Sequence, residues 1–149
     1  MAYLLDTNIL VRLVNAADSQ HAIASSAVLK LHRSGESLYI TPQVMIEFRN
    51  AATRNTALNG LGLSITDAES KAAEFEATLT LLPETPDIYP AWKVLVEALG
   101  IIGKQVHDAR LVAVCHVHSV THLLTFNVAH FSRMTGLGPG LIVIDPASV

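Results

Sequence analysis

Short apolar runs that alternate with segments of helical periodicity constrain the fold of this chain more than any other feature. Each run ends at a polar or turn-forming residue, which is typical of a buried strand. We expect strands at Ala2–Leu5, Ser37–Ile40, 79–82, 121–126 and 141–144. Because these strands alternate with helices, the sequence predicts an α/β fold with a parallel sheet that helices cover on both faces.

Caps and prolines indicate where the helices begin. Ser19 is expected to cap one helix, and Thr41 followed by Pro42 is typical of the start of another. Thr66, with Glu69 three residues later, fits a capping box. We expect helical segments over 9–14, 19–35, 42–55, 66–78, 86–99, 107–118 and 128–131.

The composition limits the class of protein. A chain of 149 residues fits a single domain over 1–149. Hydrophobic residues make up 50% of it and charged residues only 15%, which excludes a disordered chain. The single cysteine allows no intramolecular disulfide, and the N-terminus lacks the basic segment of a signal peptide. We therefore expect a cytoplasmic protein.

Two other classes are disfavoured. The longest stretch without Asp, Glu, Lys or Arg, 111–132, contains several histidines and an asparagine, so it does not fit a membrane span. The net charge of −3 argues against a purely electrostatic nucleic-acid binder. An enzyme with acids at its centre and arginines at its rim remains compatible with that charge.

Two acidic residues occupy informative positions early in the chain. Asp6 closes the first strand, at the carboxyl end where α/β proteins build their sites, although it could simply cap the next helix. Glu47 lies with Val44 and Phe48 on the apolar stripe of its helix. A carboxylate buried there is costly unless it is paired or binds a metal. Alternatively, Glu47 reaches water at the edge of the stripe or pairs with a nearby arginine.

Further polar groups are expected at the same edge of the sheet. Asp108 shares a face with Leu111 in the first turn of its helix, where a favourable interaction with the helix N-terminus would also explain it. Asn127 follows the strand over 121–126, and His130 can face the same way; the asparagine could equally form a turn. Carboxylates that converge repel one another unless a cation lies between them. Oxygen ligands of this kind suit Mg²⁺ or Mn²⁺.

Four segments then follow one another in an order that resembles a known family. They are Leu4-Leu5-Asp6-Thr7-Asn8, Val44-Met45-Ile46-Glu47-Phe48-Arg49-Asn50, His107-Asp108-Ala109 and Leu124-Thr125-Phe126-Asn127-Val128-Ala129-His130-Phe131. In this respect the chain resembles PIN-domain nucleases, and more narrowly the VapC-type toxins of bacterial toxin–antitoxin pairs. The resemblance implies a three-layer α/β/α sandwich with a central, mainly parallel sheet of about four to five strands. It also implies metal-dependent RNA cleavage, inhibition by a cognate antitoxin and a homodimer.

The resemblance also implies roles for individual residues. Asp6, Glu47 and Asp108 correspond to acids that hold Mg²⁺ or Mn²⁺, and Asn127 completes the expected catalytic set. The family often has an acid or Asn at the position of Asn127 and frequently another acid at the position of His130. Here neither residue is an acid, and this bears on a second metal ion. In the resulting hypothesis the ion makes a water more acidic, so that it attacks phosphorus in line.

Neighbouring side chains have supporting roles in this hypothesis. Thr7, Asn8 and Thr125 are candidates to orient carboxylates or waters, although Thr7 and Asn8 could be plain turn residues. The cations nearest to the acids in sequence could contact phosphate or form ion pairs. They are Arg12, Arg49 and Arg110.

Three alternatives remain open. A dehalogenase-type phosphatase also begins with a strand that ends in Asp, but it needs a second Asp where this chain has Asn8. A zinc site could use some of the seven histidines, although His116 and His118 are two residues apart on a predicted helix and do not face each other. The third alternative is a PIN-like binding or regulatory module without activity.

Overall fold

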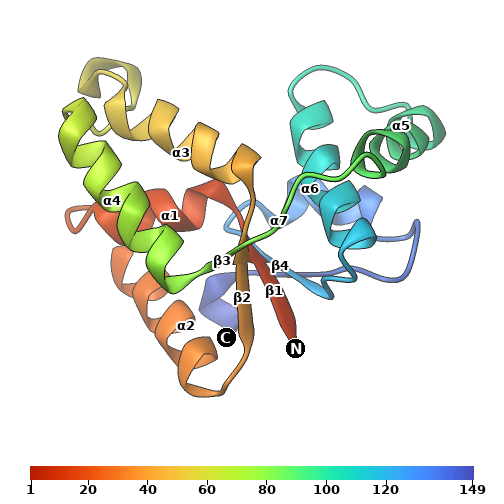
Figure 1. Ribbon diagram of the computed structural model, residues 1–149, viewed down its shortest axis with the longest axis horizontal. Coiled ribbons are helices and arrows are strands. Elements are labelled where there is room, and N and C mark those ends of the chain that lie inside the picture. The colour runs from red at the N-terminus through yellow and green to blue at the C-terminus, as the bar shows by residue number, and fades with distance from the viewer.

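Five parallel strands form the central sheet of the computed structural model, which describes all 149 residues (Figure 1). Their spatial order is β3-β2-β1-β4-β5, so the chain adds strands on one side of β1 and then crosses to the other. The parallel sheet expected from the alternating pattern is confirmed. The strands are β1 (Ala2–Leu5), β2 (Ser37–Ile40), β3 (Thr80–Leu81), β4 (His122–Leu124) and β5 (Ile142–Ile144).

Seven α-helices cover the sheet on both faces, which makes the fold a three-layer α/β/α sandwich (Figure 1). On one side lie α1 (Thr7–Val14), α2 (His21–Arg33), α3 (Pro42–Thr53) and α4 (Ile65–Thr78). On the other side lie α5 (Ile88–Leu99), α6 (Gln105–Val117) and α7 (Val128–Phe131). Three short 3-10 turns are η1 (Thr56–Leu58), η2 (Ser132–Met134) and η3 (Pro146–Ser148). No helix is both long enough and apolar enough to cross a bilayer.

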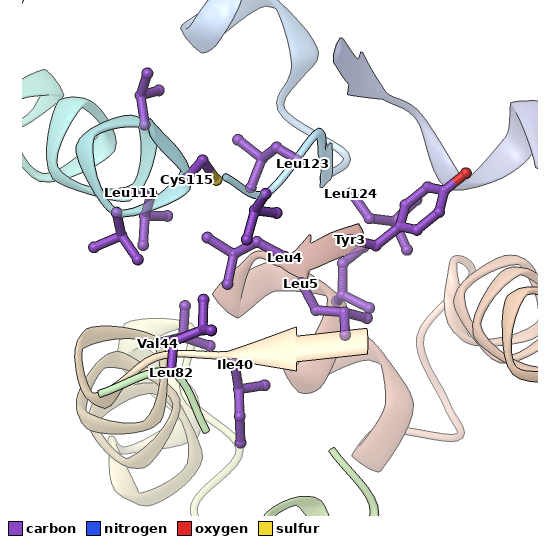
Figure 2. Close-up of a cluster of buried hydrophobic side chains, with 14 of the residues drawn as sticks. Tyr3, Leu4, Leu5, Ile40, Val44, Leu82, Leu111, Cys115, Leu123 and Leu124 are labelled. Atoms are coloured by element: carbon purple, nitrogen blue, oxygen red, sulfur yellow. The ribbon is translucent and has the colours of Figure 1, made fainter. Parts of the chain in front are cut away.

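One hydrophobic cluster of 31 buried residues joins the layers. In the register of β1 and β4, Leu4 pairs with Leu123, and both side chains lie toward Leu111 and Cys115 of α6 (Figure 2). Cys115 is fully buried. Neighbouring strand residues point to opposite faces, so β1 packs against both helical layers. The sheet is thereby held rigid between two apolar faces, with its carboxyl edge left for polar groups.

Helix α4 begins earlier than the sequence predicts. The expected cap, Thr66 with Glu69, is wrong: Ser64 Oγ accepts a hydrogen bond from the Asp67 backbone N–H at 3.0 Å and donates one to Asp67 Oδ2 at 2.7 Å. Ser64 and Asp67 have the same three-residue spacing and come one half-turn earlier. Glu69 instead pairs with Arg49 of α3.

Other element ends also differ from the expectations. Ser19 does not cap α2, whose N-cap is Gln20 without a side-chain hydrogen bond. Helix α1 begins at Thr7 because Asp6 caps it, and α6 begins at Gln105. Helix α5 begins at Ile88, which leaves Pro86 outside the helix. Strand β4 ends at Leu124, before the residues that turn their side chains toward the carboxyl edge.

Candidate active site at the carboxyl edge of the sheet

The strand order determines where polar side chains can gather. Ligand sites of doubly wound sheets lie outside the carboxyl ends of strands where the chain switches direction, here between β1 and β4. Asp6 follows β1 and Thr125 follows β4. Helix α6 leads back into β4, so its first turn, with Asp108, lies at this same edge. Glu47 reaches the edge from α3, the helix that follows β2.

Asp6 is the most enclosed acid of the group, with 7% of its surface exposed. Its Oδ1 accepts a hydrogen bond from the Thr7 backbone N–H at 2.7 Å. Its Oδ2 accepts one from Asn8 Nδ2 at 2.7 Å and one from the Thr125 hydroxyl at 2.7 Å. Asn8 also donates to Thr125 Oγ1 at 2.9 Å and accepts from the Phe126 backbone N–H at 3.2 Å. The carboxylate is thus fixed from both α1 and the end of β4.

Glu47 is joined to Asp6 through a single residue. The Thr7 hydroxyl donates to Glu47 Oε2 at 2.9 Å, while the Thr7 backbone N–H is bonded to Asp6. On its other side, Glu47 Oε1 accepts from Gln43 Nε2 at 2.9 Å. Glu47 is half-buried at the edge of the apolar stripe and is bonded to neutral donors. The alternative pairing with an arginine does not occur.

The carboxyl groups of this edge influence one another. Burial raises the pKa of Asp6 to about 6; hydrogen bonds from Thr125 and Thr7 lower it, and the charges of Asp108 and Glu47 raise it. Burial also raises the pKa of Asp108, with His130 lowering it and Glu47 raising it. His130 Nδ1 lies 3.6 Å from Asp108 Oδ2. A cation placed among the three acids would remove the repulsion between them.

Asn127 lies apart from the hydrogen-bonded group. Its backbone N–H donates to Thr125 Oγ1 at 3.0 Å, but its side chain is exposed and makes no hydrogen bond. The first turn of α7 therefore has no side-chain cap. Thr125, which the sequence suggested only as a supporting residue, makes more contacts with the acids than Asn127 does.

Of the three arginines singled out from the sequence, only one contacts this group. Arg110 donates from Nη1 to Gln43 Oε1 at 3.1 Å and from Nη2 to Glu84 Oε2 at 2.6 Å. The ion-pair alternative describes all three, because Arg110 pairs with Glu84 and the other two have acidic partners of their own. Arg12 binds Gln20 at 3.0 Å and lies 3.3 Å from Asp18, and Arg49 pairs with Glu69.

Two open hollows flank Glu47 and contain residues that the sequence did not single out. One, of about 510 Å³, is lined by Pro42, Gln43, Ile46, Glu47, Glu84, His107 and Arg110. The other, of about 490 Å³, is lined by Thr7, Glu47, Asn50, Ala51, Arg54, Lys104 and His107. Gln43 could have been found from its position four residues before Glu47, on the same helix face. Nothing local marks Lys104, because it comes from a loop that only the fold brings to Glu47.

The donor set fits a hydrated hard cation. Its members are the carboxylates of Asp6, Glu47 and Asp108, and oxygen donors of this kind suit Mg²⁺ or Mn²⁺. No group of three or more His, Cys, Asp or Glu side chains is gathered closely enough to hold a metal by itself, so the histidines form no zinc cluster. Mg²⁺ usually keeps several waters and takes one or two carboxylates, which this looser arrangement allows.

The chain was compared with protein-family models, curated sequences and solved structures. The model of the family described as PIN domain matches residues 3–137. No curated protein sequence matches the chain. Similar solved structures include VapBC2 from Rickettsia felis bound to a DNA fragment from its promoter, with 21% identity, a TM-score of 0.72, and 97% of this chain and 98% of that chain covered.

Two further structures are similar over nearly their whole length. A toxin–antitoxin complex from Klebsiella pneumoniae has 20% identity and a TM-score of 0.66, with 97% of this chain and 98% of that chain covered. VapC20 from Mycobacterium tuberculosis, described as a toxin that cleaves the sarcin–ricin loop, has 20% identity and a TM-score of 0.64, with 89% and 95% covered. At these identities the likeness concerns the fold.

Proposed function

The chain belongs to the PIN-domain family, and from this premise we propose that it is a Mg²⁺- or Mn²⁺-dependent endoribonuclease, the toxin of a toxin–antitoxin pair. Its substrate in this proposal is cellular RNA, whose cleavage arrests growth. A cognate antitoxin inhibits it, and it works in the cytoplasm as a homodimer of single-domain chains. The toxin–antitoxin complexes among the similar structures support the antitoxin partner.

One observation carries the proposal: Thr7 bridges two acids that come from different segments of the chain. Its backbone N–H holds Asp6 and its hydroxyl holds Glu47, while Asp108 acts on the pKa of Asp6 through its charge. The charges of Asp108 and Glu47 both raise the pKa of Asp6, so repulsion among these acids opposes the ionisation of Asp6 in the metal-free protein. Such an arrangement is expected where a cation is needed for function.

In this proposal, each side chain has a defined task. Asp6, Glu47 and Asp108 would hold the ion, and the chemistry that it would supply when bound is a more acidic water and compensation of charge on the leaving oxygen. Thr7, Asn8 and Thr125 fix the direction of the Asp6 and Glu47 oxygens through their hydrogen bonds.

Two other residues flank the acids. His130 adjusts the charge of Asp108, and Arg110 holds Gln43, which in turn donates a hydrogen bond to Glu47. Asn127, exposed beside Thr125, is left free to bind a water or the substrate.

The test is RNA cleavage by matched isosteric variants. We expect Asp6→Asn and Asp108→Asn each to reduce cleavage of single-stranded RNA, in Mg²⁺ or Mn²⁺, by at least about 100-fold, because each removes charge from the ion's site. Asp87→Asn is the control, since Asp87 is exposed and makes no side-chain hydrogen bond at the start of α5. Undiminished cleavage by both site variants would refute the mechanism.

A second candidate function is a PIN-like module that binds without cleaving. The exposed Asn127 and the His130 imidazole, in place of acids, favour it. Isothermal titration with Mn²⁺ separates the two, because an active nuclease must bind the ion and Asp6→Asn must weaken that binding. Absence of any Mn²⁺ binding by the native protein would favour the module.

A further inference from the structure

A third hollow lies beside the candidate active site and shares two lining residues with one of the two hollows that flank Glu47. It has a volume of about 320 Å³ and is lined by Glu84, Thr85, Ile88, Tyr89, Trp92 and Arg110. Glu84 and Arg110 also line the hollow that contains Glu47. An RNA strand that follows this surface would therefore pass from Glu47 over Arg110 into a pocket with an aromatic wall.

The wall consists of two stacked rings on α5. The ring centroids of Tyr89 and Trp92 lie 5.6 Å apart, with an angle of 26° between the planes. Trp92 is fixed because its Nε1 donates to the Val106 backbone oxygen at 2.7 Å. Tyr89 is 67% exposed, although large aromatic side chains usually gain stability by burial. The ring is thus held in place on one side and open to solvent on the other.

The charges that line this hollow favour a nucleobase over a phosphate as its ligand. Arg110 is bound to Glu84 at 2.6 Å, so the two charges at the junction offset each other. No free cation remains on this side for a phosphate. The opposite hollow beside Glu47 contains Lys104 and Arg54, which suit the sugar–phosphate backbone. The surface therefore offers cations on one side of Glu47 and a rigid aromatic face on the other.

We propose that the Tyr89–Trp92 pair stacks against an unpaired nucleobase of the RNA strand whose backbone lies at Glu47, and so requires single-stranded substrate beside the cleavage point. This inference rests on the proposed ribonuclease function and adds to it a base-binding subsite. Stacking on an aromatic ring tolerates any base, because every base has a π-face. Tyr89 is pre-organised by Trp92, so little side-chain entropy is lost on binding.

The experiment measures binding separately from cleavage. Trp92 is the only tryptophan of the chain, so its fluorescence reports directly on this hollow. The full-length protein carrying Asp6→Asn is titrated with a short single-stranded RNA of mixed sequence and with an abasic RNA of the same length. We expect the first RNA to quench the fluorescence and the abasic RNA, which has the same phosphates, to quench it much less.

Variants of the exposed ring test the contact itself. In the Asp6→Asn background, Tyr89→Ala should weaken binding of the base-containing RNA by about 5- to 100-fold, whereas Tyr89→Phe should change it less than about 2-fold. Val94→Ala is the control, because Val94 is 64% exposed on the same helix and does not line the hollow. Circular dichroism confirms that the variants fold.

The outcomes of the inference and of the proposed function are distinguishable. Equal binding of both RNAs, or unchanged binding by Tyr89→Ala, overturns the base-binding subsite even if the native protein cleaves RNA. Tyr89-dependent binding without any cleavage by the native protein supports the subsite and refutes the nuclease.

Discussion

Compared with the native protein, the metal-free Asp6→Asn variant should become more stable as the pH rises. Burial raises the pKa of Asp6 from 3.8 to about 6 in the folded chain. The folded state therefore binds this proton more tightly than the unfolded state does. The resulting stabilisation is fully present below about pH 4 and is lost as the pH rises through about 6. The difference in pKa corresponds to about 3 kcal/mol in the free energy of unfolding.

The asparagine variant isolates this contribution from those of other titrating groups. The asparagine amide does not ionise. Its NH₂ group, however, faces the N–H and O–H donors that bind the Asp6 carboxylate in the native protein, which lowers the free energy of unfolding by about 1–3 kcal/mol. We expect the native protein to be the more stable of the two at pH 4 and to lose about 3 kcal/mol relative to the variant by pH 8. Urea unfolding in EDTA, measured at several pH values, gives the difference directly. A difference that stays constant over this range refutes the reasoning.

Metal ions should restore the stability that the native protein loses as the pH rises. If the ion binds the charged Asp6 carboxylate, as proposed, Mg²⁺ at about 100 times its Kd should stabilise the native protein at pH 8 by about 2.7 kcal/mol. The Asp6→Asn variant should gain clearly less. Equal stabilisation of both proteins would mean that the ion binds elsewhere.

Two further substitutions test the contacts described above. Thr7→Val removes the hydroxyl that holds Glu47 but keeps the backbone N–H, and we expect RNA cleavage to fall by about 10- to 100-fold, while Thr7→Ser retains it; equal activity of both would contradict the bridging role. Gly138→Ala should destabilise the fold by about 1–3 kcal/mol in thermal unfolding, because φ is +89° and a Cβ would lie 2.6 Å from the His116 ring. Gly136→Ala, with nothing within 4 Å, is its control.

Much of the fold could be predicted because its signals are local. The run Ala2–Leu5 and the alternation of strands with helices determine the layers, since each pattern has its own period. The cap of α4 could not be predicted with the same certainty. Ser64 and Thr66 each have an acid three residues later, and only the packing decides which of them caps the helix.

The candidate site, too, could be predicted only in part from the sequence. Asp6 and Glu47 stand out because a charge beside an apolar run needs an explanation within its own segment. That Thr7 bridges the two acids, or that Arg110 reaches Gln43, depends on segments that are distant in the chain. That Tyr89 and Arg110 line the same hollow has no local pattern either, because it follows from the packing of α5 against α6.

The position of β4 between β1 and β5 has a consequence for the order in which the protein becomes competent during synthesis. Asp6 is synthesised 119 residues before Thr125, whose hydroxyl donates a hydrogen bond to Asp6 Oδ2. The edge of β1 beside Leu4 also stays unpaired until β4 has emerged. A nascent chain that has not reached Thr125 therefore carries Asp6 and Glu47 without one of the hydrogen bonds that fix Asp6 Oδ2. The candidate site is therefore complete only after Thr125 and β4 have been made, and under the proposed function we expect no RNA cleavage by a shorter nascent chain.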